Sequence, residues 1–465
     1  MPKAKKYLLY GILAAEVFGV LLALIFSNTL ICDDFEHLRM TYLVSLGRIP
    51  YIDFFQHHHP LLWYLFTPFI LWLPQNMVLI LYVARIIAFS VRLLTFYVIY
   101  RIMKQYFGKK KLFIFFLLAV FSFYPMWYGF SSFKPDIFSQ FFYFAGLLYF
   151  FKYLQKEKIY HLCICGLYFT IGFLFLQTIV FEVFPLIIPL AIKMKNNRKT
   201  LKDTVFAMFP SLLLLAGCAC LLHKAGIWNP YFEMNWLYNL KRDGLTDDYT
   251  KIHFYLVQLL LMLAAWSWLY KKKKTNLYIN SIGFLYVFSF VHNLYFSVIH
   301  LHYLIPMFIY GAMLSAPILK EIFSDSELKD FRFYGSAYFI IFVLINFTTL
   351  RNMNNLEYIK TLQQMKADRI MYTVNLESAY FQVYAAPVSF YEVNRKICAL
   401  DDELFDRFPD FDINKLINAY KPKYLDYKVP APNDKFKNER FTLSKETIKN
   451  YRQIAPSLWQ RNETF

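Results

Sequence analysis

Acidic residues and histidines gather in one stretch of this chain, residues 27–76. Asp33 and Asp34 open the stretch, Asp53 lies in its middle, and a run of three histidines begins at His57. The flanking sequence is almost entirely Leu, Ile and Phe, so these ionisable groups stand at the edge of an apolar segment. Placing charge there has a large desolvation cost, which makes the stretch a candidate functional site.

The paired acids suggest general-base chemistry. A carboxylate that faces a cavity can take a proton from a hydroxyl group that is about to act as a nucleophile. Either Asp33 or Asp34 could serve in this way. The competing interpretation is that both residues only cap the helix that follows them, since Asp is a common capping residue.

Metal binding by His57, His58 and His59, together with an Asp or Glu, is the second chemistry to weigh. Consecutive residues rarely point to one centre, and the stretch has no His-x-x-x-His spacing. We therefore interpret His57 and His58 as the polar lining of a cavity and predict no metal site. Whether a divalent metal serves as a cofactor is left open.

Other candidate residues lie at the predicted outer ends of apolar runs. A lysine there can clamp a phosphate and stabilise charge on a leaving group, or can be a simple snorkelling anchor. A further pair of charges, Arg85 and Arg92, shares a helix face and is interpreted as part of an ion pair with Glu182. The candidates for substrate binding, besides Asp53, His57 and His58, are Lys134, Asp136, Lys241, Arg242, His302 and Tyr303.

The composition defines the class of protein that must position these groups. Hydrophobic residues make up 58% of the 465 positions and aromatic residues 21%, which is typical of a polytopic membrane protein. The net charge of +18 comes largely from basic clusters between the apolar runs. This is the positive-inside pattern of cytoplasmic loops, so we expect no nucleic-acid partner.

About eleven runs are long enough to cross a bilayer as helices. Alternating them across the membrane, with the N-terminus inside, puts every basic cluster on the cytoplasmic side. Residues 161–192 must then form two short spans rather than one. The predicted spans are Leu8–Phe26, Met77–Tyr100, Leu112–Trp127, Ile137–Tyr153, His161–Leu176, Thr178–Ile192, Thr204–Leu222, His253–Tyr270, Leu277–Val298, Tyr303–Leu319 and Tyr334–Leu350.

This threading divides the chain into two predicted domains. Residues 1–350 form the transmembrane domain, whose outer loop 27–76 includes an interfacial helix over 61–73. Residues 351–465 form a small extracytoplasmic α/β domain, because short apolar runs alternate there with polar clusters. Within it we expect strands over 369–374 and 424–428 and a helix over 413–420.

Three motifs resemble a known class of enzymes. Asp33-Asp34-Phe35-Glu36-His37, followed by Gly47-x-x-Pro50-Tyr51-x-Asp53 and His57-His58-x-Pro60, resembles the first outer loop of bacterial GT-C glycosyltransferases of family 39. This group includes protein O-mannosyltransferases and the lipid A aminoarabinose transferase. Lys134-Pro135-Asp136 and His302-Tyr303-Leu304-Ile305-Pro306 are similar to later motifs of the group. Asp34 stands where the group usually has Glu, and by position Asp33 matches the acid assigned as base.

The resemblance implies an inverting glycosyltransferase at the outer face of the bacterial inner membrane. It would move a sugar from a polyprenyl-phosphate carrier to a hydroxyl of a lipid, glycan or protein. The alternative from another class is a flippase or transporter of lipid-linked glycans, although such proteins place coupling charges near the bilayer midplane. A purely structural membrane partner would leave the histidine-rich loop unexplained.

Overall fold

The computed structural model describes most of the predicted membrane region and part of the tail. The described ranges are 32–54, 56–73, 77–107, 132–241, 252–295 and 305–322, and in the tail 371–373, 414, 417–418, 421, 424–426, 443–455 and 458–462. Three predicted spans, residues 8–26, 112–127 and 334–350, lie outside these ranges. The other eight predicted spans fall on helical segments.

Two compact units make up the chain. Unit 1 comprises residues 1–27, 85–224 and 239–352, and unit 2 comprises residues 28–84, 225–238 and 353–465. Unit 1 contains most of α4 together with the long apolar helices. Its elements are α4 (Met77–Ile102), η1 (Met103–Phe107), α7 (Pro135–Lys156), α8 (Ile159–Phe175), α9 (Ile179–Val183), η3 (Phe184–Leu186), α10 (Ile187–Asn196), α11 (Lys199–Lys224), α14 (Ile252–Lys271), α15 (Leu277–Tyr295) and α16 (Ile305–Ile322).

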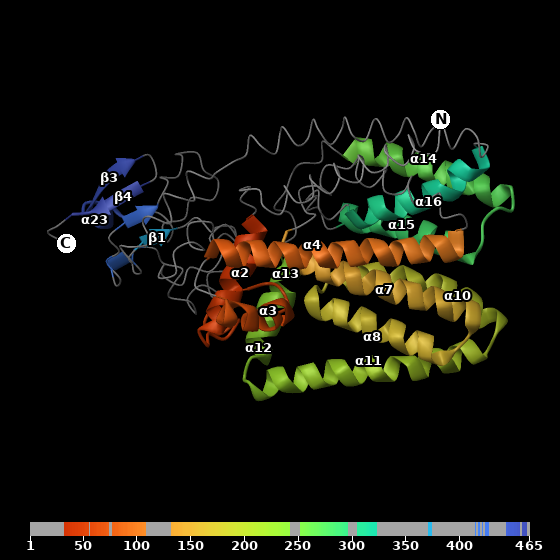
Figure 1. The fold of residues 1–465 in the computed structure, drawn as a ribbon, viewed down its shortest axis with the longest axis horizontal. Helices are drawn as coiled ribbons and strands as arrows, with labels where there is room; N and C mark the ends of the chain where they lie inside the picture. Colours follow the sequence, from red (N-terminus) through yellow and green to blue (C-terminus); the bar gives the residue numbers. More distant parts are fainter. Residues whose placement is uncertain are drawn as a thin grey trace, which may run out of the picture. The chain divides into compact units, whose positions relative to one another are not determined.

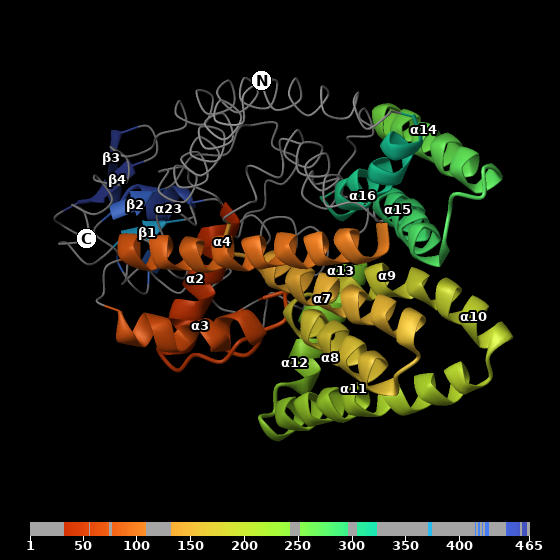
Figure 2. The same cartoon turned by 45° about the vertical axis from the view of Figure 1, so that its right-hand side comes forward.

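Helices α7, α8 and α11 lie side by side, and α14, α15 and α16 form a second group (Figures 1 and 2). The α7–α8 pair approaches closely at Gly146, where an added Cβ would come within 2.5 Å of the Phe169 ring. A residue with a side chain at position 146 would therefore require the Phe169 ring or the helices to shift. Helix α8 ends at Phe175 and the backbone of Leu176 is extended before α9 begins. This break agrees with the prediction of two short segments between 161 and 192.

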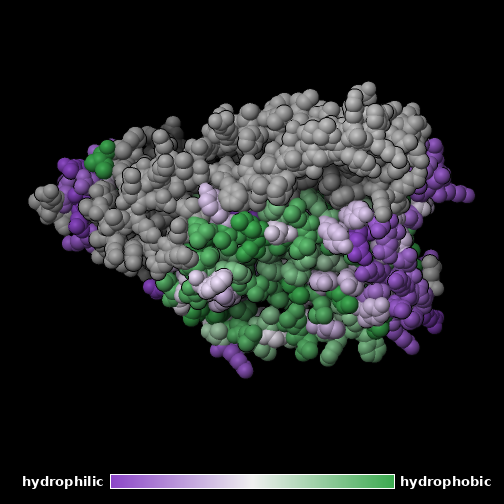
Figure 3. Space-filling view, in the orientation of Figure 1, coloured by the Kyte–Doolittle hydropathy of each residue, from purple (hydrophilic) through white to green (hydrophobic). Residues whose placement is uncertain are grey.

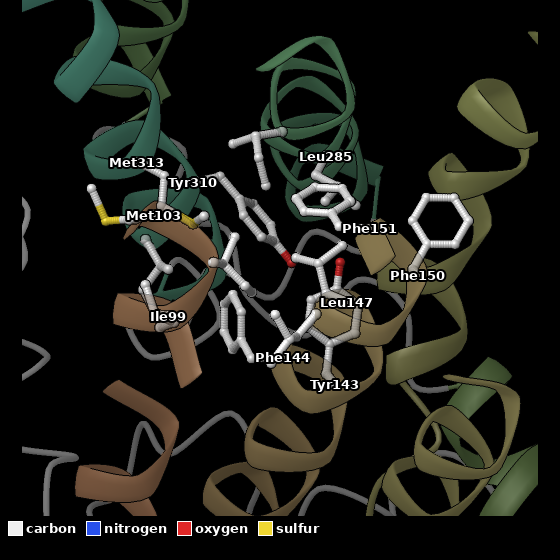
Figure 4. Close-up of a cluster of buried hydrophobic side chains, with 14 of the residues drawn as sticks. Ile99, Met103, Tyr143, Phe144, Leu147, Phe150, Phe151, Leu285, Tyr310 and Met313 are labelled. Carbon is white, nitrogen blue, oxygen red and sulfur yellow. The ribbon is translucent and has the colours of Figure 1, made fainter. Parts of the chain in front are cut away.

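An aromatic and aliphatic core holds unit 1 together. Figure 4 shows side chains of α4, α7, α15 and α16 meeting around Tyr310, whose hydroxyl points toward Tyr143. In water, burial of such side chains would stabilise by roughly 1.5–3 kcal/mol each. Inside a bilayer the same contacts act through close packing instead.

The outside of unit 1 is apolar along the helices and polar at one end (Figure 3). On α11 the side chains of Val205, Phe206, Phe209 and Leu213 are exposed. At the polar end, where α7 gives way to α8 and α10 to α11, Lys193 forms an ion pair with Glu157 at 2.5 Å. Among the described residues, four helices are long and apolar enough to cross a membrane: Leu79–Phe107, Pro135–Lys156, Lys199–Lys224 and Ile305–Ile322.

Unit 2 begins with α2 (Cys32–Ser45), which ends in a defined backbone motif. Gly47 has a φ of +80°, its N–H donates to the Val44 carbonyl, and the Arg48 N–H donates to the Leu43 carbonyl. These are the two bonds of a Schellman cap, which favours glycine at this position because the backbone is left-handed. Helix α3 (Leu61–Trp72) matches the predicted interfacial helix, with Leu62, Trp63, Phe66 and Ile70 buried and Leu65, Phe69, Leu71 and Trp72 exposed.

The rest of unit 2 comes from two distant parts of the chain. Residues 225–238 contain α12 (Trp228–Tyr231) and η4 (Phe232–Leu237), and α13 (Tyr238–Lys241) follows. The tail contains a four-stranded sheet in the order β1-β2-β4-β3, formed by β1 (Met371–Thr373), β2 (Tyr424–Asp426), β3 (Tyr451–Ala455) and β4 (Leu458–Arg461), and the short helix α23 (Lys445–Ile448). Strands β1 and β2 fall inside the two predicted strands and pair in parallel. That the tail is an independent domain over 351–465 stays a prediction.

Candidate functional site

The histidine-rich segment of unit 2 packs around α2. Every residue from Asp34 to Val44 is buried, although Glu36, His37 and Arg39 are polar or charged. Buried groups of this kind need hydrogen-bond partners. Glu36 receives such a bond from Gln56 in the segment 56–59, which is neither helix nor strand.

Gln56 is central to this packing. Its Nε2 donates to the Glu36 Oε1 at 2.8 Å, and its Oε1 accepts from the His57 backbone N–H at 2.7 Å. Because both ends of one amide are used, Gln56 fixes the orientation of Glu36 and the start of the histidine run together. A second link joins α2 to α3, since the Trp63 Nε1 donates to the His37 Nδ1 at 3.3 Å.

The histidines converge more than the sequence suggested. The ring centroids of His57 and His58 lie 4.1 Å apart, and ligand atoms of Glu36, His57 and His58 all lie within 4.8 Å of one another. The argument that consecutive residues diverge holds for regular backbone, but this segment is irregular. We call Glu36, His57 and His58 the histidine cluster. The metal alternative that the sequence offered joined the histidines to an Asp or Glu, and the structure brings Glu36 to His57 and His58.

A third histidine contacts the later part of unit 2. The Tyr231 hydroxyl and the His59 Nδ1 are 3.0 Å apart, and the Trp236 Nε1 donates to the same hydroxyl at 3.4 Å. Burial, together with the neighbouring His58, lowers the pKa of His59 to about 3. His59 is therefore neutral at physiological pH and serves to join two stretches of unit 2.

The acids of the first loop take different places. Helix α2 begins at Cys32, so Asp33 and Asp34 both lie in its first turn, where negative charge is favoured by the helix dipole. Asp34 is fully buried, whereas the side chain of Asp33 lies outside the described residues. The Asp53 Oδ2 accepts from the Ile49 N–H at 2.6 Å, so Asp53 closes a local turn. Its role in substrate binding stays a prediction.

Unit 1 contains a cavity with a polar lining, which we call the helix-end cavity. The empty space of about 560 Å³ includes open solvent, so the cavity is partly open. The lining comes from the first turns of α7, the α8–α9 break, α9, the end of α15 and the start of α16. It comprises Asp136, Ser139, Gln140, Tyr143, Phe144, Leu176, Thr178, Ile179, Glu182, His292, Pro306 and Tyr310.

Glu182 is the most deeply engaged acid of the helix-end cavity. Its carboxylate accepts hydrogen bonds from the Tyr310 hydroxyl and from Ser289. The Tyr143 hydroxyl donates to the Glu182 backbone carbonyl at 3.3 Å. Glu182 thus bonds to neutral hydroxyls, where the sequence had suggested an arginine partner. Sequence reasoning missed Tyr310, since nothing distinguishes it among 37 tyrosines.

Asp136 also lines the helix-end cavity. It lies in the first turn of α7 after Pro135 and is close enough to Arg92 for their charges to interact. The Arg92 guanidinium donates to the Gln140 Oε1, which lines the same cavity. Lys134, just before α7, is buried, whereas a snorkelling lysine would hold its ammonium group in water.

The remaining predicted site residues fall outside the described side chains. These are Arg242, His302 and Tyr303, and the side chain of Lys241 at the end of α13. The structure therefore brings His57 and His58 together with Glu36 in unit 2, and Asp136 together with Gln140 and Glu182 in unit 1. Carboxylates, amides and hydroxyls beside aromatic rings can bind a polyhydroxylated ligand.

The fold is of the GT-C type seen in crystal structures of the membrane protein ArnT. It is similar to the crystal structure of ArnT from Cupriavidus metallidurans in the apo state, with a TM-score of 0.57 at 11% identity over 82% of this chain and 85% of that chain. It is similar also to the same ArnT bound to undecaprenyl phosphate, with a TM-score of 0.55 at 10% identity and the same coverage.

Residues 58–223 match the dolichyl-phosphate-mannose-protein mannosyltransferase family. No curated protein matches the sequence. The family match and the shared fold confirm the resemblance to GT-C glycosyltransferases of the family 39 type that the loop motifs indicated. The matched residues include Asp136, Gln140 and Glu182 of the helix-end cavity.

Proposed function

We propose that this chain is an inverting glycosyltransferase that moves a sugar from a polyprenyl-phosphate carrier to a hydroxyl group. The acceptor is a lipid, a glycan or a protein, and the reaction takes place at the outer face of the inner membrane. The observation that carries the proposal is the family match over residues 58–223, because it includes the polar side chains of the helix-end cavity. The undecaprenyl phosphate bound by ArnT supports a polyprenyl carrier.

The helix-end cavity suits the sugar of such a donor. Asp136 and Glu182 can accept hydrogen bonds from sugar hydroxyls, and Tyr143 and Tyr310 offer hydroxyls and ring faces. The apolar outer surface of the helices suits the isoprenoid tail. A polar cavity within apolar helices is expensive to maintain without a ligand, which is why intramembrane acids mark substrate sites.

The chemistry needs one base and one cation. The base, Asp33 or Asp34, takes the proton of the acceptor hydroxyl, and that oxygen attacks the anomeric carbon. The bond from this carbon to the phosphate oxygen breaks, and its electron pair stays on the phosphate. Lys134, with Lys241 or Arg242, stabilises the growing charge, so the leaving group needs no proton. Attack from the side opposite the phosphate inverts the anomeric carbon.

Mass spectrometry of envelope lipids, glycans and proteins in a strain that lacks this chain tests the proposal. We expect one sugar to disappear from one acceptor and to return when the intact chain is expressed. A variant with both Asp33→Asn and Asp34→Asn should insert normally yet fail to restore it. An unchanged envelope would contradict the proposal. Restoration of the sugar by the double variant would show that neither Asp33 nor Asp34 is the base.

A further inference from the structure

The histidine cluster of unit 2 has the chemistry of a metal site. Glu36 contributes a carboxylate oxygen from α2, and His57 and His58 each contribute an imidazole nitrogen. These three atoms all lie within 4.8 Å of one another, with Glu36 and His57 buried and His58 half-buried. Zinc ligands lie ~2.0–2.2 Å from the metal, so these atoms would have to move closer together for one ion to contact all three.

We propose that Glu36, His57 and His58 bind one divalent cation of the zinc class. Two imidazole nitrogens and one carboxylate oxygen form a donor set that suits zinc, and hard ions such as Mg²⁺ and Ca²⁺ prefer oxygen ligands alone. Three protein ligands leave a fourth position for water or a small anion. All three proposed ligands belong to unit 2.

Groups around the cluster already orient the ligands. The Gln56 Nε2 donates to the Glu36 Oε1 at 2.8 Å and so fixes the direction of this carboxylate. The Gln56 Oε1 holds the His57 backbone, and the Tyr51 hydroxyl donates to the His58 backbone carbonyl. Such outer contacts are typical of metal sites, because they fix the direction in which each ligand points.

The ion would join two parts of the chain that are about twenty residues apart. Glu36 is on a regular helix, whereas His57 and His58 lie on irregular backbone that has no ladder of hydrogen bonds. A metal that binds only the folded arrangement stabilises it by mass action. We therefore expect the cation to order the segment 56–59 against α2, and metal content and stability report this without any assay of activity.

The test uses the full-length protein, purified in detergent, stripped with a chelator and dialysed against Zn²⁺ alone. Elemental analysis should find one tightly bound zinc per chain, and Zn²⁺ should raise the midpoint of thermal unfolding. Glu36→Gln and His58→Gln keep similar shapes and should each lose the bound zinc. Gln56→Leu should retain the site but bind zinc about 10–100-fold more weakly, as loss of an outer contact does.

His59→Gln is the matched control, because His59 is a buried neighbour that is no member of the cluster. It should bind zinc as tightly as the unaltered chain. Monodisperse elution of each variant shows that it has folded. The proposal fails if the unaltered chain retains no zinc, or if folded Glu36→Gln and His58→Gln bind as much zinc as His59→Gln. The second result would assign the metal to histidines elsewhere.

Discussion

The Tyr310 hydroxyl donates a hydrogen bond to the Glu182 carboxylate, although the two residues are 128 positions apart in the chain. The bond joins the start of α16 to α9 at the wall of the helix-end cavity. This hydrogen bond orients the Glu182 carboxylate through a neutral hydroxyl rather than through an ion pair with a basic residue. An acid held in this way retains its capacity to bind hydroxyls of a ligand.

Removing the Tyr310–Glu182 bond should lower the catalytic efficiency with the sugar donor. We expect Tyr310→Phe to lower kcat/KM for the donor by about 10–100-fold, since hydrogen bonds to charged groups contribute about 1.5–3 kcal/mol. Tyr286→Phe is the control: this buried tyrosine of α15 does not line the cavity, and its hydroxyl has no hydrogen-bond partner among the described residues. Equal kinetics in Tyr310→Phe and Tyr286→Phe would show that this bond of the helix-end cavity has no part in the reaction.

Asp33 is expected to be the general base and Asp34 its helper. Asp33→Asn keeps the shape of the side chain and removes its basicity, so turnover should fall by about 10²–10⁴-fold. Asp34→Asn should have a smaller effect on turnover, measured under donor saturation with equal amounts of inserted protein. The opposite order of effects would transfer the role to Asp34, which is buried in the first turn of α2.

Lys134 is expected to stabilise the phosphate of the donor as the sugar leaves. Lys134→Ala should lower both donor affinity and turnover, because a buried cation acts on charge that grows in the transition state. Lys134→Arg keeps the charge with a different geometry and should retain partial activity. If Lys134→Ala changes only the yield of inserted protein, the lysine is an anchor and the cation must come from Lys241 or Arg242.

The tail is expected to lie outside the cytoplasm. An odd number of spans with the N-terminus inside puts Phe465 on the outer side. Alkaline phosphatase fused after Phe465 should therefore be active, because it folds only outside the cytoplasm. A fluorescent protein that matures only in the cytoplasm should stay dark at the same position. The reverse pair of signals would overturn the predicted orientation and the outer-face reaction with it.

Regular features of the fold were predictable because their signals are local. Apolar runs with basic ends predicted α4, α7, α8, α10, α11, α14, α15 and α16, and Pro60 with the following apolar run predicted α3. The short helices α12, η4 and α13 were not predicted, because they lie in a stretch without a long apolar run. The break between α8 and α9 could be predicted from charge alone, since placing Lys158 and Lys193 on the same side of the membrane requires two spans between them. Gly47 was part of the sequence motif, and the Schellman cap at the end of α2 explains why glycine is favoured at this position.

The side chains of the site were harder to predict, because they depend on contacts between distant residues. His57 and His58 converge on Glu36 only because the backbone of 56–59 is irregular, which residue spacing does not reveal. Tyr310 reaches Glu182 through packing of α16 against other helices. Glu182 could be singled out from the sequence because it is a charged residue within a predicted span. Its neutral hydrogen-bond partners became evident only from the structure.

Reconstituted transfer is the most direct test of the proposed function. The purified chain in liposomes is given a panel of polyprenyl-phosphate sugars with lipid, glycan and peptide acceptors, and products are read by mass spectrometry. The account predicts that one donor yields a glycosylated acceptor and an equal amount of free polyprenyl phosphate, with inversion at the anomeric carbon. Movement of the intact donor across the bilayer, with no sugar transferred to any acceptor, would instead identify a flippase and contradict the account.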